Sequence, residues 1–239
     1  MSGHSKWATI KRKKGAIDAE RSKIFQKLNK EIYVAAKAGD KNPDNNPGLR
    51  MIIEKAKAQN MPKDRIQAAI DKAKNAQSGE DYEFVRYEGY GPNGVAIIVD
   101  TLTDNRNRTA GDVRSTFTKR GGNLGTDGSV SYMFERKGLI ILPNTYDEEE
   151  IMMIALDNDA LDFIVNEDSY EIYTKYEDFI KVNKALEENN ITEFLMNETR
   201  FIPSNTISLD DEAKEKIYNL IETLEDLDDV QDVYHNLED

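Results

Sequence analysis

The chain has 239 residues, 38% of them hydrophobic and 32% charged, with a formal net charge of −13 at pH 7, which suits one to two ordinary domains or three small ones. Cysteine is absent and the two histidines, His4 and His235, lie near the chain ends, which argues against disulfides, thiolate nucleophiles, Ser-His-Asp triads and zinc sites. No apolar run is long enough for a membrane span or a Sec-type signal, so we expect a cytoplasmic protein with no membrane partner.

Apolar residues recur at three- and four-residue spacing in three stretches of the first 75 residues. The first expected helix starts after Asp18, a capping residue, and ends at Gly39. Loop residues over 40–48 separate it from a second helix, and Pro62 suits the first turn of a third. We therefore expect a basic arm over 2–16 followed by a three-helix domain.

The apolar period changes after a polar linker that begins at Ser78. Strands are expected over 84–87 and 95–101, joined by a connection rich in glycine. A helix should follow Asn105 and end at Gly121, and the alternation over 130–134 predicts another strand.

Residues 138–203 show the order strand, helix, strand, strand, helix, strand, which is the ferredoxin-like order. The acidic tail adds one helix and a short strand over 230–234, which can complete the middle domain. The predicted fold is therefore α+β and multidomain, with an N-terminal three-helix domain and two α+β domains, the ferredoxin-like one inserted in the other. The expected domains are 1–77, then 78–136 together with 207–239, and the inserted 137–206.

Charge is distributed very unevenly along the chain. Residues 1–75 hold 18 Lys/Arg against 8 Asp/Glu, residues 76–137 hold 8 against 9, and residues 138–239 hold 6 against 28. The first block can therefore lie against phosphates, whereas the last block would be repelled by them. Nucleic acid is expected to meet the N-terminal end.

The N-terminal arm is the first candidate binding segment. Trp7 can stack on a base or ribose, His4 and Ser5 can donate hydrogen bonds, and the run Lys11, Arg12, Lys13 and Lys14 can neutralise phosphates. The alternative is a solubilising tail whose tryptophan packs on the helical domain.

A second cluster lies over residues 103–109 and continues to Arg114. Arg106 and Arg108 in this cluster can contact phosphates, but they can equally pair with nearby carboxylates while Asp104 and Asn105 cap a helix. The glycines that follow fit no phosphate-loop pattern and are expected to stop the helix and occupy positive-φ turns. Asp157, Asp159 and Asp162 do not complete a calcium loop, so no metal is assigned.

Several short motifs are spread over the first 130 residues. They are Gly3-His4-Ser5-Lys6-Trp7, Arg21-Ser22-Lys23-Ile24-Phe25, Asn60-Met61-Pro62-Lys63-Asp64, Tyr87-Glu88-Gly89-Tyr90-Gly91-Pro92, Asp104-Asn105-Arg106-Asn107-Arg108-Thr109, Gly121-Gly122-Asn123-Leu124-Gly125 and Gly128-Ser129-Val130. Together they resemble the YebC/PmpR family. Beyond about residue 134, only the spacing of elements and Phe201-Ile202-Pro203 match.

The resemblance implies three domains and no established catalytic residues or cofactor. It implies DNA-binding transcriptional regulators in some members. In others, including a mitochondrial translational activator, it implies factors that act on the ribosome when elongation stalls. The candidate nucleic-acid-binding residues are therefore His4, Ser5, Lys6, Trp7, Lys11, Arg12, Lys13, Lys14, Arg21, Lys23, Arg106, Arg108 and Arg114.

Two functional hypotheses follow, and neither is an enzyme. The first is a DNA-binding transcriptional regulator, as the name of the resembling family indicates. The alternative is a ribosome-associated factor that binds ribosomal RNA through the arm, with its acidic domains facing outward or towards basic ribosomal proteins. An enzyme that used carboxylates alone would need a pocket in which one of them has a strongly raised pKa.

Overall fold

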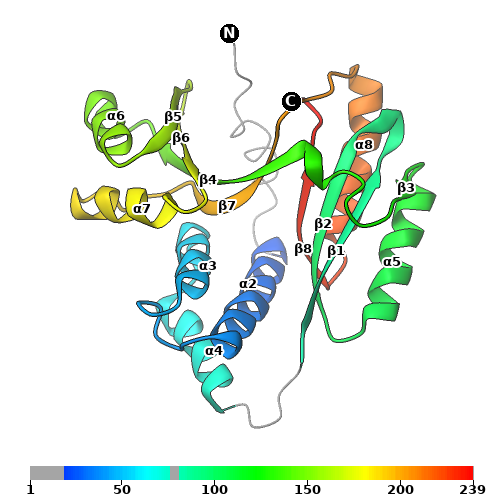
Figure 1. Cartoon of the computed structure of the whole chain (residues 1–239), viewed down its shortest axis with the longest axis horizontal. Coiled ribbons are helices and arrows are strands. Elements are labelled where there is room, and N and C mark those ends of the chain that lie inside the picture. The colour runs from blue at the N-terminus through cyan, green and yellow to red at the C-terminus, as the bar shows by residue number, and fades with distance from the viewer. Residues whose placement is uncertain (1–18, 76–80, 239) are drawn as a thin grey trace. The chain divides into compact units, whose positions relative to one another are not determined.

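A computed structural model describes residues 19–75 and 81–238 (Figure 1). The described chain forms two compact units, the first made of residues up to 75 together with 136–200, the second of 81–135 and 201–238. The boundary falls within strands β4 and β7, so the chain passes from one unit to the other inside a strand. No helix among the described residues is long and apolar enough to cross a membrane.

Three helices form the described N-terminal residues 19–75 of the first unit, as predicted: α2 (Ala19–Ala38), α3 (Pro47–Ala58) and α4 (Lys63–Asn75). Their apolar stripes bury Leu28, Ile32 and Leu49 almost completely. Asn46 fixes the turn between the first two helices, because its Oδ1 accepts from the Leu49 N–H at 3.0 Å and its Nδ2 donates to the Ala35 carbonyl at 2.9 Å.

The rest of the first unit has the ferredoxin-like arrangement. Its elements are β4 (Phe134–Pro143), α6 (Glu148–Asp157), β5 (Ala160–Val165), β6 (Ser169–Lys175), α7 (Phe179–Glu188) and β7 (Met196–Pro203). The strand order is β5-β6-β4-β7, and the antiparallel register pairs Ile140 with Ile172. One core joins both helices to one face of the sheet through Ile140, Ile172, Ile151 of α6 and Phe179 of α7. The predicted ferredoxin-like fold is confirmed.

The second unit is built on another four-stranded antiparallel sheet, ordered β3-β1-β2-β8. Its elements are β1 (Glu83–Tyr90), β2 (Ala96–Thr103), α5 (Arg106–Lys119), β3 (Asn123–Leu124), α8 (Asp211–Glu225) and β8 (Val230–His235). Helices α5 and α8 pack on the same face through Phe117 and Leu220, against Ile97 and Val99 of β2. The C-terminal helix and strand therefore complete the middle α+β fold, as predicted.

The strand predicted over residues 130–134 is wrong for most of its length. Residues Ser131–Met133 form a 3-10 turn, and strand β4 begins only at Phe134. Val130 and Phe134 are both buried in one cluster, and their four-residue spacing fits a turn of helix as well as an alternating strand. The two-residue strand β3 was not predicted, since so short a segment has no period. The division into three domains stays a prediction.

Candidate nucleic-acid interface

The candidate arm lies outside the described residues. This applies to His4, Ser5, Lys6, Trp7, Lys11, Arg12, Lys13 and Lys14. Their role in binding therefore stays a prediction from sequence.

Arg21 lies in the first turns of α2, where it faces an aromatic ring that two arginines share. The Arg21 guanidinium carbon lies 6.0 Å from the centre of the Phe25 ring, and that of Arg65 on α4 lies 5.5 Å from the same centre. Phe25 is buried, whereas both arginines are exposed. A guanidinium over an aromatic face can still donate its N–H groups to phosphate, so the ring positions two cations for an anionic ligand.

The same arrangement recurs further along the two helices. Lys37 of α2 and Lys72 of α4 place their ammonium groups 5.8 Å and 5.4 Å from the centre of the Tyr33 ring. In both cases the α2 cation is four residues from its aromatic neighbour, which puts the two side chains on one helix face. We call the four cations Arg21, Arg65, Lys37 and Lys72 the α2–α4 seam.

The seam was missed by sequence reasoning apart from Arg21. Cations four residues from an aromatic residue on α2 were a local signal that could have been used. The α4 cations could not have been matched to those rings without knowing how α2 and α4 pack. Lys23, the other predicted residue of this helix, is half-buried and already has an interaction within the chain.

The predicted arginines at the start of α5 are engaged with carboxylates. Arg106 Nη1 lies 3.2 Å from Glu83 Oε1 in an exposed pair. Arg108 Nη2 donates to Asp229 Oδ2 at 2.6 Å and to Asp104 Oδ1 at 2.8 Å. The hydrogen bond to Asp229, followed by that to Asp104, raises the pKa of Arg108 above its usual value. Both carboxylates oppose the approach of a phosphate to this helix end.

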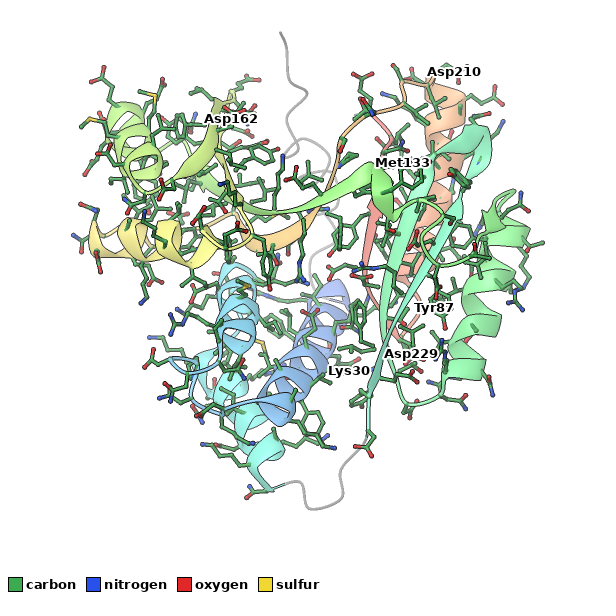
Figure 2. The ribbon with its side chains drawn as sticks, viewed as in Figure 1. Lys30, Tyr87, Met133, Asp162, Asp210 and Asp229 are labelled. Atoms are coloured by element: carbon green, nitrogen blue, oxygen red, sulfur yellow. The ribbon has the colours of Figure 1, made fainter. Side chains whose placement is uncertain are left out.

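Asp229 is the centre of a hydrogen-bond network that holds α5 to the end of β2. Its Oδ2 also accepts from the Thr109 hydroxyl at 2.8 Å and from the Thr103 hydroxyl at 3.2 Å, and all three residues are buried. Figure 2 labels Asp229. Asn105 caps the helix, its Oδ1 accepting from the Arg108 N–H at 3.1 Å. The motif from Asp104 to Thr109 thus has a structural role. Helix capping and pairing with carboxylates were the alternative expected from the sequence, but the sequence did not indicate Asp229 as the partner.

Arg114 is exposed further along α5. Lys119 and Arg120 are also exposed at the end of this helix. The structure therefore places Arg106, Arg108 and Arg114 on one helix of the second unit, whereas the α2–α4 seam belongs to the first unit.

The glycine-rich segment after α5 is a loop organised by a carboxylate. Glu88 Oε2 accepts from the N–H groups of Val130 and Ser131, each at 2.8 Å, and its Oε1 accepts from that of Gly128 at 3.0 Å. Burial alone would raise the pKa of Glu88, but these backbone donors outweigh it and lower the pKa. The N–H groups that a phosphate loop would offer to its ligand are thus already bound to Glu88, and Gly121 and Gly128 have the expected positive φ.

Two family models match the chain. The model described as the TACO1/YebC protein N-terminal domain matches residues 5–76, and the one described as the TACO1/YebC second and third domain matches residues 82–237. The chain belongs to the TACO1/YebC family. This agrees with the resemblance read from the motifs.

Relatives of this TACO1/YebC chain match it along its whole length. A protein of Geobacillus kaustophilus is 51% identical and one of Hathewaya histolytica 52% identical, each covering 100% of this chain, which spans 98% and 97% of them. Both are named probable transcriptional regulatory proteins, a name for regulators and not for enzymes. A conserved hypothetical protein of Aquifex aeolicus, known from a crystal structure, is 45% identical with a TM-score of 0.85 over 98% of this chain and 97% of its own.

Proposed function

We propose that the protein is a non-enzymatic, DNA-binding regulator of transcription that acts in the cytoplasm. The names of its relatives support the regulatory role. The seam of the described helices supports the contact with nucleic acid, since it places four cations beside two buried rings. The predicted arm adds four consecutive cations to the same end of the chain.

The distribution of charge along the chain supports the three N-terminal helices as the binding surface. Residues 19–75 hold 13 Lys/Arg against 7 Asp/Glu, whereas residues 138–239 hold 6 against 28. Phosphate contacts by Lys and Arg release counterions and supply most of the sequence-independent affinity for DNA. The same polyanion would repel the acidic residues 138–239, so the charge distribution favours binding through the helical part.

The first test asks whether duplex DNA is the preferred ligand. Fluorescence anisotropy of the full chain would be measured with a labelled 30-base-pair duplex and with a structured ribosomal RNA fragment of equal charge, at the same salt concentration. We expect tighter binding to the duplex. At least tenfold tighter binding to the RNA would overturn the DNA proposal in favour of the ribosome-associated alternative, and binding to neither would overturn both.

The seam gives a second prediction at a described residue. Arg65→Ala should weaken DNA binding at every sequence and make the log-log salt slope shallower by about 1, because one phosphate contact is lost. Lys74→Ala is the matched control, since Lys74 is on the same helix but pairs with Asp71 at 2.9 Å. Equal slopes for the two variants would remove Arg65 from the interface.

A further inference from the structure

Helix α6 has an apolar surface on more than one side. Its central residues Ile151–Leu156 are all apolar, and a helix that is hydrophobic all round is expected to be buried. Ile151 and Ala155 do face the core and are fully buried. Met152, Met153 and Leu156, by contrast, are 37%, 62% and 49% exposed. One side of α6 therefore packs in the core, and the other side exposes apolar side chains to solvent.

The strand that follows α6 also exposes apolar side chains. Strand β5 contacts α6 and lies at the edge of its sheet, and its Leu161 and Val165 are 46% and 50% exposed. Five of the eight large hydrophobic side chains that are exposed among the described residues thus belong to one helix and one adjoining strand. We call Met152, Met153, Leu156, Leu161 and Val165 the α6–β5 surface. Clustering of this kind is typical of interaction sites.

The segment that carries the α6–β5 surface is strongly acidic. Residues 147–168 hold nine Asp/Glu and no Lys/Arg (Figure 2 labels Asp162). The glutamates in the first turn of α6 interact favourably with the helix dipole and so stabilise the helix. Asp157 in the last turn interacts unfavourably with the same dipole. Helix stability therefore does not account for the acid at that end. Asp159 of this stretch pairs with Lys181.

We propose that the α6–β5 surface binds a basic segment of another protein, in which apolar side chains are flanked by Lys or Arg. The apolar side chains would pack on Met153 and Leu156, and the cations would pair with acidic residues of the segment 147–168. Such complementarity raises the association rate and excludes acidic competitors. This interaction goes beyond nucleic-acid binding and uses a different part of the chain.

Other occupants fit the surface less well. Nucleic acid would meet nine carboxylates. A symmetric contact with a second copy would bring the same acidic residues together, because an isologous interface apposes identical patches. Addition of a strand to the edge is opposed by the irregular register between Ala160 and Asp162 and by the exposed Asp162 itself.

The test uses synthetic helical peptides with the full-length protein. One peptide has leucine on one face and lysine on the other, a second replaces leucine with serine, and a third replaces lysine with glutamate. We expect measurable binding of the Lys/Leu peptide by calorimetry and at least tenfold weaker binding of the other two. Equal binding of the Lys/Ser peptide would overturn the proposal, since charge alone would then account for it. Failure of the Lys/Leu peptide to bind would overturn it too.

Variants locate the site. Met153→Asp and Leu156→Asp should each weaken binding of the Lys/Leu peptide at least tenfold, and Asp157→Lys should also weaken it. Phe84→Asp is the matched control, because Phe84 is 55% exposed and lies in the other unit. Unchanged binding by both α6 variants would overturn the proposal, as would a dimer in sedimentation that Met153→Asp dissociates. Circular dichroism of each variant would verify that it folds.

Discussion

Replacing Glu88 with Ala is expected to lower the free energy of unfolding by about 3 to 5 kcal/mol, because three backbone N–H groups lose their acceptor at once. Glu88 is 5% exposed, and the Val130 N–H that it accepts from is buried as well. Chemical denaturation followed by circular dichroism measures the loss. Glu83→Ala is the control on the same strand, since Glu83 is exposed, and it should change stability by no more than about 0.5 kcal/mol. A Glu88→Ala protein as stable as this control would show that the bonds from Glu88 to the backbone of Gly128, Val130 and Ser131 do not stabilise the fold.

The same carboxylate makes stability depend on pH in a stated direction. The pKa of Glu88 is lowered from its usual value of 4.5 in the folded protein. Its contribution is therefore fully present above the unfolded-state pKa and is lost as the pH falls through the lower folded-state value. The difference in unfolding free energy between the natural protein and Glu88→Gln should be constant from neutral pH to about 5.5 and shrink below about 4.5.

Asp229→Ala is the second substitution with a large expected effect. It should reduce the free energy of unfolding by about 2 to 4 kcal/mol, because the buried hydroxyls of Thr103 and Thr109 both lose a charged acceptor. Asp229→Asn keeps one oxygen in place and should lose less. Glu222→Ala, an exposed acid on α8, is the control for loss of one negative charge and should be near neutral.

Thermal and urea unfolding of these three variants test the network. Equal stability of Asp229→Ala and Glu222→Ala would show that Asp229 does not hold α5. The distinction matters for function, because a loss of DNA binding in Arg108→Ala has two possible origins. If Asp229→Ala reduces binding as much as Arg108→Ala does, the arginine acts by positioning α5 and not by touching phosphate.

The fold was largely predictable because most elements are long enough to show a period. The ferredoxin-like order followed from strands and helices in sequence, and its core residues Ile140 and Ile172 sit on one sheet face as alternation requires. Strand β3 has only two residues, which is too short to show a period. The spacing of Val130 and Phe134 indicated a strand wrongly, because a spacing of four residues fits both the strand period and the helix period.

The candidate site was predictable only where its partners are local in sequence. The capping role of Asn105 could be stated from the motif. The pairing of Arg108 with Asp229, 121 residues away, could not. Likewise, Arg65 and Arg21 meet at the Phe25 ring because α2 and α4 pack together, although α3 lies between them in the sequence. Tertiary contacts of this kind carry no short-range signal.

We infer that the basic N-terminal part of the chain binds nucleic acid. The salt dependence of DNA binding tests this most directly. The affinity of the full chain for a duplex would be measured from 50 to 300 mM salt, beside a variant with Lys11, Arg12, Lys13 and Lys14 replaced by Ala. We expect a log-log slope that is shallower by about 3 to 4 units in the variant, because up to four phosphate contacts are lost. An unchanged slope would contradict it and place the binding surface elsewhere on the molecule.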